Sequence, residues 1–360
     1  MKKLIKRILS ILIIIVLIPV VLGALFVTIL AVTEYRPKVS EVVEVENNTN
    51  TKISVNQAIK IMTFNIGYAS LSKTEDFVMD GGVKSKPDSI NLVRNNLDTL
   101  IANAGDYNAD IYFFQEIDIA SDRSFDINQL AEFKSVFSNM NFSYAPNFRV
   151  LFVPFPFSLG NMIGKVESGI VTATNFKVNS AERIQLPGEF VWPVRLANLK
   201  RALIVSRLPI ENSTKELILI NGHLSAYDDG SMREQEMAKL KEIMETEYAK
   251  GNYVIVGGDF NQTFPDADGI YPITDTTNYI APTIPNTFLP TGFAYAIDLT
   301  SPTCRLLNKP YDPLDPTTQY YLIDGFIVSS NVSVNYVSTL NLNFENSDHN
   351  PVTMEIVLQP

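Results

Sequence analysis

The sequence predicts a layered α/β fold that follows one membrane-spanning helix. Runs such as 58–67 and 109–118 are apolar along most of their length, as is typical of strands in sheets covered by helices. Amphipathic segments at 88–104 and 231–251 lie among such runs, and strands outnumber helices. The chain has 360 residues, of which 46% are hydrophobic and 19% charged, enough for a large core.

Residues 1–33 predict a cytoplasmic stub and a membrane anchor. No charge occurs in residues 8–33, and this run exceeds the roughly 20 residues that span a bilayer. A cleaved signal peptide would have a shorter apolar region and a small-residue cleavage site, and we see no good site of that kind. The basic residues before the run place the N-terminus in the cytoplasm and the rest outside, in a single-pass cell-membrane protein: Lys2, Lys3, Lys6 and Arg7.

A polar segment follows the anchor, over residues 34–57. It contains few bulky core residues, so we expect a linker next to the membrane. A single folded domain is expected over residues 58–360. Its first strand is expected at 58–67 and its first helix at 88–104, where one apolar face recurs at helical spacing: Ile90, Val93, Leu97, Leu100 and Ile101.

Further strands are expected after 109–118, at 166–176, 201–210, 216–226, 253–261, 320–330 and 351–359. The helix at 231–251 is expected to end at Gly251, a C-cap candidate. The segment 148–164 is rich in Phe and Pro and has no acidic residue. It is either a loop that covers the core, or an apolar rim near the membrane or a lipid substrate.

Polar side chains that bind metals or transfer protons end or interrupt these apolar runs. Both histidines of the chain are among them. Taken singly, most have an ordinary explanation as a turn, a solvated strand end or a satisfied core histidine. Asp324 has no such ordinary explanation, because a carboxylate between apolar neighbours needs a partner. A histidine is a suitable partner. Together they indicate one site: Asn65, Glu116, His223, Asp259, Asn261, Asp324, Asp348 and His349.

The residue types at these strand ends suit a hard divalent cation. Carboxylate and amide oxygens are ligands for Mg²⁺, Mn²⁺ or Ca²⁺, and the sequence offers Glu116, Asp259 and Asp348 with Asn65 and Asn261. Zinc fits poorly, because there is no His/Cys cluster. A carboxylate-held Mg²⁺ with imidazoles nearby is suited to phosphoryl chemistry.

Two smaller features lie near these strand ends. Cys304 is the only cysteine, which excludes an intramolecular disulfide, and it is interpreted as a small buried hydrophobe rather than a nucleophile. Gly257 and Gly258 directly precede Asp259. Glycine lets a backbone come close to a phosphate or a metal, and the pair is interpreted in that way.

The order of the short motifs resembles the endonuclease/exonuclease/phosphatase superfamily, whose members include pancreatic-type deoxyribonucleases and neutral sphingomyelinases. The motifs are TFNI, FFQEID, NGHLS, GGDFN, LIDGFIV and NSDHNPV, and the resemblance covers about residues 58–360. It implies a four-layer α/β sandwich, in which two mixed sheets pack face to face with helices outside. It also implies a catalytic domain that hydrolyses phosphodiesters with a divalent metal, Mg²⁺ first and Mn²⁺ or Ca²⁺ as alternatives.

The resemblance also implies a role for each residue of the site. Asn65, Glu116 and Asp348 would hold the metal, with Glu116 as the principal ligand. Asp259 and Asn261 would orient the attacking water and the phosphate. His223 would contact the phosphate or act as an acid. Asp324 would hold His349, which would serve as a base or stabilise the transition state.

Three hypotheses for the function remain, and a monomer is expected in each. The first is an endonuclease-like enzyme outside the membrane, which needs a local basic groove because the net charge of −10 argues against a diffuse one. The second is a sphingomyelinase-like phospholipid or small-molecule phosphodiesterase, which the anchor and 148–164 support. The third, a catalytically inactive tethered binding module, conflicts with the intact ligand set. The groove candidates are Arg149, Lys165, Arg183, Arg195, Lys200, Arg201 and Arg207.

Overall fold

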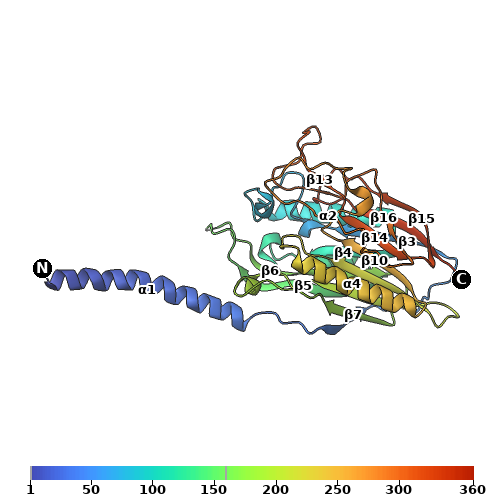
Figure 1. Cartoon of the computed structure of the whole chain (residues 1–360), viewed down its shortest axis with the longest axis horizontal. Helices are drawn as coiled ribbons and strands as arrows, with labels where there is room; N and C mark the ends of the chain where they lie inside the picture. The colour runs from blue at the N-terminus through green and yellow to red at the C-terminus, as the bar shows by residue number, and fades with distance from the viewer. Residues whose placement is uncertain (1, 159) are drawn as a thin grey trace.

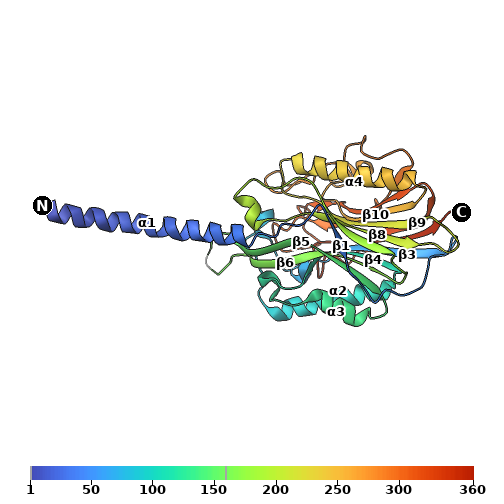
Figure 2. The ribbon, with the colours of Figure 1, turned by 90° about the horizontal axis from the view of Figure 1, so that it is seen from below.

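A computed structural model describes residues 2–158 and 160–360 of the chain. It confirms the four-layer α/β sandwich behind an N-terminal apolar helix. Figure 2 shows helix α4 (Ser231–Ala249) on one outer face and helices α2 (Ile90–Tyr107) and α3 (Gln129–Val136) on the other. Two seven-stranded sheets lie between them. Met1 and Leu159, which belong to the segments 1–33 and 148–164, lie outside the described residues.

The first sheet has the strand order β15-β16-β3-β4-β6-β5-β2. Strands β3 and β4 are parallel and are joined by α2, whereas the other pairs are antiparallel. A two-residue hairpin cannot join parallel strands, so a crossover helix is needed. The bounds are β2 (Val45–Glu46), β3 (Ala58–Asn65), β4 (Ile111–Asp118), β5 (Asn141–Val153), β6 (Gly164–Thr174), β15 (Val332–Thr339) and β16 (Val352–Leu358).

The second sheet has the order β1-β7-β8-β9-β10-β14-β11 and repeats this plan. Strands β9 and β10 are parallel and are joined by α4, whereas the other pairs are antiparallel. The bounds are β1 (Ser40–Val43), β7 (Ser180–Gln185), β8 (Ala202–Pro209), β9 (Glu216–His223), β10 (Tyr253–Asp259), β11 (Phe293–Ala296) and β14 (Asp324–Ser329).

The shorter elements lie in the connections. Strands β12 (Cys304–Arg305) and β13 (Tyr320–Tyr321) form a separate pair. The 3-10 helices are η1 (Gly67–Ala69), η2 (Val78–Asp80), η3 (Asp122–Ser124), η4 (Val194–Ala197) and η5 (Pro265–Ala267).

The core is layered in the same way as the fold. Between the sheets, Ile61 and Phe113 pack with Ile255 and Phe326, and the rings of Phe113 and Phe326 are 6.5 Å apart. Phe114, the next residue along β4, packs under α2 and α3 instead. A third cluster fills the space under α4. Because both faces of the central strands are covered, these strands are apolar throughout, as the sequence predicted.

Residues 34–57 differ from the expected linker, because part of this segment belongs to the sheets. Strand β1 pairs with β7, and β2 pairs with β5. Ile53 is fully buried and forms a bridge with Ile210. Backbone pairing at a sheet edge needs no apolar run, which is why composition alone indicated a linker.

The segment 148–164 combines both of the structures expected for it. Its first residues complete β5, which pairs with β6. Phe148 and Val153 are buried in a small apolar cluster, which fits the core-covering alternative. Phe157 is 86% exposed, which fits the apolar-rim alternative.

Helix α1 (Lys2–Val32) extends away from the sandwich, with the N-terminus at its far end (Figure 1). It is the one described helix that is long and apolar enough to cross a membrane. Most of its length is exposed, but its last turns contact the folded domain. Phe26 meets Phe152 with ring centroids 6.2 Å apart, and Leu30 is buried.

Candidate active site

The sheet topology brings all the predicted site residues to one edge of the sandwich. Asn65 ends β3, Glu116 lies near the end of β4, and His223 and Asp259 end β9 and β10. Parallel strands joined by a crossover helix present their carboxyl ends on the same side. The antiparallel neighbours begin there, so Asp324 starts β14 opposite Asp259, and Asp348 and His349 precede β16.

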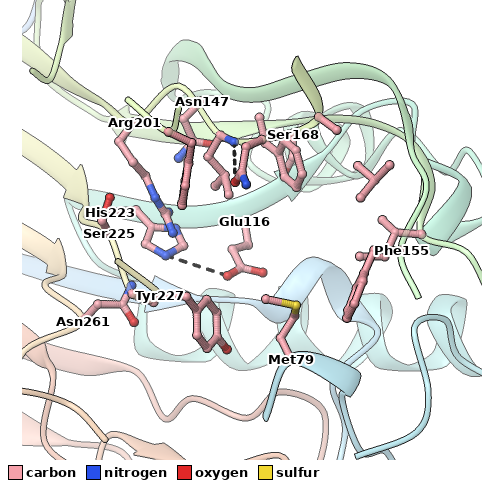
Figure 3. A pocket seen from close by; sticks show the side chains of 18 of the residues that line it. Met79, Glu116, Asn147, Phe155, Ser168, Arg201, His223, Ser225, Tyr227 and Asn261 are labelled. Atoms are coloured by element: carbon pink, nitrogen blue, oxygen red, sulfur yellow. Dashed lines mark hydrogen bonds and ion pairs between the residues drawn. The ribbon is translucent and has the colours of Figure 1, made fainter. Parts of the chain in front are cut away.

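A cavity of about 640 Å³ opens at this edge. Residues that line it include Glu116, His223, Asp259, Asn261, Asp348 and His349. Asn65 and Asp324 lie behind them and make hydrogen bonds to this lining. The structure therefore assembles the complete predicted set, and Figure 3 shows Glu116, His223 and Asn261 together with Arg201 and Tyr227.

His349 is held by the partner that the sequence predicted. Its Nδ1 atom lies 2.8 Å from Oδ2 of Asp324, and both side chains are buried. Burial lowers the pKa of His349, but the Asp324 carboxylate and other negative groups outweigh it and raise this pKa well above its ordinary value. The imidazole is therefore a buried cation at neutral pH.

Asn65 and Asp259 are joined directly across the two sheets. Asn65 Nδ2 donates to Asp259 Oδ2 at 2.9 Å and lies 3.4 Å from Glu116 Oε1. The other Asp259 oxygen accepts a hydrogen bond from the Asn261 backbone N–H at 2.8 Å. Burial and the neighbouring Asp324 carboxylate raise the pKa of Asp259 to about 6.

His223 has the opposite electrostatic setting from His349. Its Nε2 atom lies 3.5 Å from Asp259 Oδ2. The same atom lies 3.9 Å from Glu116 Oε1, and Figure 3 marks this second contact with a dashed line. Burial, together with the positive charges of Arg201 and His349, lowers the pKa of His223 well below its ordinary value. Its buried Nδ1 atom has no hydrogen-bond partner within the described residues. The site thus contains one charged and one neutral imidazole.

Glu116 reaches the cavity because β4 is irregular at this point. The pairing of β4 with β6 shifts register between Phe114 and Ile117, and Glu116 has a left-handed φ of 57°. Such a conformation in a non-glycine residue is strained and is found at functional sites. Its side chain is 22% exposed, against 2% for Asp259.

The carboxylates of this site fit a bound divalent cation. Burial raises the pKa of Glu116, and burial and the Glu116 charge raise the pKa of Asp348 to about 7. Within residues 2–158 and 160–360, no Lys or Arg forms an ion pair with Glu116, Asp259 or Asp348. The His349 imidazolium, 3.7 Å from Asp259 and 3.9 Å from Asp348, offers one positive charge among these three carboxylates, and the remaining negative charge favours a bound cation.

Two compact groups mark where ligand atoms converge. One comprises Asp259, Asp324 and His349, and the other Cys304, Asp348 and His349, each with its atoms within 4.8 Å of one another. Burial raises the pKa of the Cys304 thiol to about 12, so before any metal binds it is a neutral thiol at neutral pH rather than a nucleophile. The remaining donors are mainly oxygens, which suit Mg²⁺, Mn²⁺ or Ca²⁺.

Several cavity residues have no counterpart among the predicted site residues. Arg201, which the sequence indicated only as part of a basic groove, lies beside His223 (Figure 3). Its buried Nη1 atom has no hydrogen-bond partner in the described part of the chain. Arg123 stacks on the ring of Tyr68 at 3.6 Å and is paired with Asp118. Arg201 is a single arginine directly before the apolar strand β8, and such a residue has no sequence pattern that would identify it as part of the site.

The glycine pair before Asp259 has a different role from the expected one. A Cβ on Gly257 would lie 2.5 Å from the ring of Phe113 in the opposite sheet. A Cβ on Gly258, whose φ is +146°, would lie 1.9 Å from the backbone oxygen of Gly222. Close packing between and within the sheets, rather than contact with a phosphate or metal, therefore explains these glycines.

Comparison with known proteins agrees with this architecture. Residues 62–349 match the Endonuclease/Exonuclease/phosphatase family. No curated protein sequence matches the chain. An endonuclease/exonuclease/phosphatase from Beutenbergia cavernae is a similar solved structure, with a TM-score of 0.56 and 14% identity over 84% of this chain and 72% of that one.

Two further solved structures share the fold. D. rerio TDP2 complexed with single strand DNA product has a TM-score of 0.52 and 14% identity, covering 83% of this chain and 99% of that one. The human Nocturnin catalytic domain with bound sulfate anion has a TM-score of 0.51 and 17% identity, covering 88% and 98%. The family match spans most of the chain and contains the assembled site. The chain belongs to the endonuclease/exonuclease/phosphatase family.

Proposed function

We propose that the chain is a divalent-metal-dependent phosphodiester hydrolase that uses the strand-end site. The observation that carries the proposal is a convergence of groups in one cavity of the described chain. Three carboxylates without a Lys or Arg ion pair meet two imidazoles there, one neutral and one charged. Such a site binds a cation, a phosphate and a water molecule together. Membership of the family supports the same class of reaction.

In this proposal Glu116, Asp348 and Asn65 hold the metal, with Mg²⁺ as the first choice. A bound divalent cation supplies charge neutralisation at a phosphate oxygen and lowers the pKa of a coordinated water. Asp348 must lose its proton to act as a ligand, and its pKa of about 7 before metal binding makes that possible at neutral pH.

The protein residues position the reactants and move the protons. Asp259 and Asn261 orient the attacking water, whose oxygen bonds to phosphorus while the bond from phosphorus to the leaving oxygen breaks. Asp259 accepts a proton from the water, and His349 donates one toward the leaving oxygen. Because Asp324 keeps His349 protonated, His349 acts as an acid and charge stabiliser rather than as a base.

His223 and Arg201 are proposed to hold the phosphate. Neutral His223 has one N–H to donate, and Arg201 carries a buried guanidinium nitrogen without a partner among the described residues. Hydrogen-bond donors fixed in a buried site stabilise charge that develops on phosphate oxygens.

Helix α1 is proposed to be a retained anchor, with the N-terminus in the cytoplasm and the catalytic domain outside. The packing of Phe26 on Phe152 supports this, as does the burial of Leu30. Cleavage of this helix as a signal peptide would remove α1 side chains that line the cavity. The basic residues before the span favour this orientation.

The candidate basic groove is largely neutralised in the folded domain. Arg149 pairs with Glu167, and Lys165 with Asp126. The others except Arg201 are buried or ion-paired as well: Arg183, Arg195, Lys200 and Arg207. This charge pattern weakens the endonuclease-like hypothesis, which needs free cations along a phosphate backbone. It favours a second candidate, the phospholipid phosphodiesterase.

An assay panel tests the proposed function. The full chain in dodecyl maltoside micelles is offered bis-p-nitrophenyl phosphate, plasmid DNA, RNA and sphingomyelin, each with Mg²⁺ or with EDTA. We expect metal-dependent cleavage of at least one diester. Inertness toward every substrate, with no effect of EDTA on thermal stability, would instead identify a catalytically inactive tethered binding module.

A further inference from the structure

The cavity continues from the polar site toward the membrane as an apolar channel. We define the membrane-side channel by the end of α1 (26–30), the last residue of β5 with the residues that follow it (153–157) and the segment 188–199 that contains η4. All three segments line the same cavity as Glu116 and His349. The three segments are far apart in sequence: η4 contacts β5, and the end of α1 packs on both.

The length of α1 places the mouth of this channel at the membrane surface. A helix rises about 1.5 Å per residue, so a hydrocarbon layer of about 30 Å takes about 20 residues. A span that begins at Ile8, directly after the basic residues, then ends near residue 28. Phe26, Val27 and Leu30, which line the cavity, therefore lie at the outer boundary of the hydrocarbon layer.

The surface around the mouth is apolar and exposed. Phe157 is 86% exposed, Trp192 is 62% exposed, and Val191 is 77% exposed. Trp192 lies two residues before the start of η4, which contacts the end of α1. Exposed aromatic side chains beside a membrane span are typical of surfaces that enter the headgroup region. This rim would bring the channel into direct contact with lipid.

The two ends of the cavity differ in chemistry. Figure 3 shows Met79 and Phe155 lining the apolar side, whereas Glu116, His223 and Arg201 gather at the polar side. Near the mouth, the charges of Arg195 and Lys200 are offset by Glu34 and Glu189. A ligand that fits both ends carries a phosphate at one end and a hydrocarbon chain at the other.

We propose that the membrane-side channel takes the hydrocarbon chain of a membrane phosphodiester lipid, with α1 as one of its walls, and places the phosphate in the site. This inference rests on the proposed function and assigns its substrate class. Water adds to phosphorus, the bond to one ester oxygen breaks, and the products are a phosphomonoester and an alcohol. The substrate enters sideways from the outer leaflet without leaving the membrane surface.

A pair of synthetic diesters tests the channel. Ethyl p-nitrophenyl phosphate and hexadecyl p-nitrophenyl phosphate share the leaving group and differ only in the chain. With the full chain and Mg²⁺ in dodecyl maltoside micelles, we expect kcat/KM to be roughly 100-fold higher for the hexadecyl diester. Release of p-nitrophenol measures both reactions, and hexadecyl phosphate is the second product.

Variants separate the channel from simple partitioning into micelles. Phe155→Asp introduces a charge in the channel, so we expect the hexadecyl-to-ethyl ratio to fall by about tenfold or more. Leu314→Asp is the matched control, because Leu314 is 88% exposed and does not line the cavity, and its ratio stays at the wild-type value. Met79→Asp replaces Phe155→Asp if thermal unfolding shows that the latter does not fold.

The outcomes distinguish this inference from the proposed function. A ratio near one, an equal ratio in Phe155→Asp and Leu314→Asp, or faster cleavage of single-stranded DNA than of the hexadecyl diester would overturn the channel alone. No hydrolysis of either diester by a chain that cleaves another substrate of the assay panel would also overturn the channel alone. Inertness toward these diesters and the whole panel with Mg²⁺ would overturn the proposed function and the channel together.

Discussion

Nδ1 of His349 lies 2.8 Å from Oδ2 of Asp324, and this contact joins the two sheets of the sandwich. His349 precedes β16 in the first sheet, and Asp324 begins β14 in the second. The buried carboxylate keeps the imidazole charged, and the sheet packing fixes its direction. The proposed proton donor depends on both sheets and is therefore sensitive to changes in either one.

Replacement of His349 tests its role as an acid. We expect His349→Ala to lower kcat toward bis-p-nitrophenyl phosphate by roughly 10²- to 10⁴-fold, the range for loss of one general acid or base. Circular dichroism should show an intact fold. Retention of most of the activity would contradict the assignment.

Replacement of Asp324 tests how the charge on His349 is maintained. Asp324→Asn removes the carboxylate that raises the pKa of His349, so the imidazolium should lose its proton at a lower pH. In the profile of kcat against pH, we expect the alkaline limb to move to lower pH. We also expect the maximum kcat to be lower. An unchanged alkaline limb would show that the carboxylate does not control His349.

Arg201 is expected to contact the phosphate. Arg201→Met keeps the length of the side chain but removes its charge, and kcat/KM should fall about 10²-fold, as for loss of one buried donor to a developing anion. Arg201→Lys should recover part of the loss. Arg149→Met is the control, because Arg149 is exposed and paired with Glu167. Equal effects of the two Met variants would argue against a specific contact.

Gly257 is expected to matter for stability rather than for metal binding. Gly257→Ala brings a methyl group against Phe113, and overpacking of this kind destabilises by about 1–3 kcal/mol. Gly105→Ala in α2 is the control, since the nearest atom to its Cβ is 3.9 Å away and alanine favours a helix. Melting temperatures should fall for the first variant and rise slightly for the second.

The pair of Glu247 and Arg207 should make stability depend on pH. Burial opposes ionisation of Glu247, but Arg207, Lys250 and Asn252 outweigh it and lower its pKa to about 2. Because the folded-state pKa is below the unfolded one, the stabilisation is present above the unfolded pKa of about 4.3 and is lost as pH falls toward 2.

Glu247→Gln should therefore melt at a lower temperature than the wild type at pH 7, and the difference should shrink as pH falls below about 5. Glu242→Gln is the control, because Glu242 is 65% exposed in its pair with Lys239 and should have little effect. A difference for Glu247→Gln that stays constant from neutral to acid pH would contradict the effect of the pair.

The sequence predicts the site better than it predicts the surroundings of the site. Asn65, Glu116, His223 and Asp259 each end an apolar run, and carboxyl ends of parallel strands meet at one edge. The edge strands β1 and β2 escape prediction because backbone pairing needs no apolar pattern. The sequence does not predict the proposed contact of Arg201 with the phosphate, because the position of Arg201 beside His223 depends on tertiary packing.

The membrane-side channel could not be read from the sequence for a related reason. The apolar character of the segment 148–164 is visible in the sequence. Only the folded structure shows which of its residues belong to β5 and which line the channel. The end of α1 reads as part of a uniform membrane span, and nothing in its composition marks Phe26 or Leu30 as cavity residues. Contacts between segments this far apart depend on the complete fold.

Hydrolysis of bis-p-nitrophenyl phosphate as a function of Mg²⁺ concentration, by the full chain and by Glu116→Gln, tests the central claim most directly. Glu116→Gln keeps the shape of the side chain but removes the charge of the principal proposed ligand. We predict that the wild type needs Mg²⁺, and that the variant needs a Mg²⁺ concentration about 10- to 100-fold higher or loses activity. Hydrolysis that is insensitive to EDTA, or identical Mg²⁺ dependence in the two proteins, would contradict a metal-dependent site at Glu116.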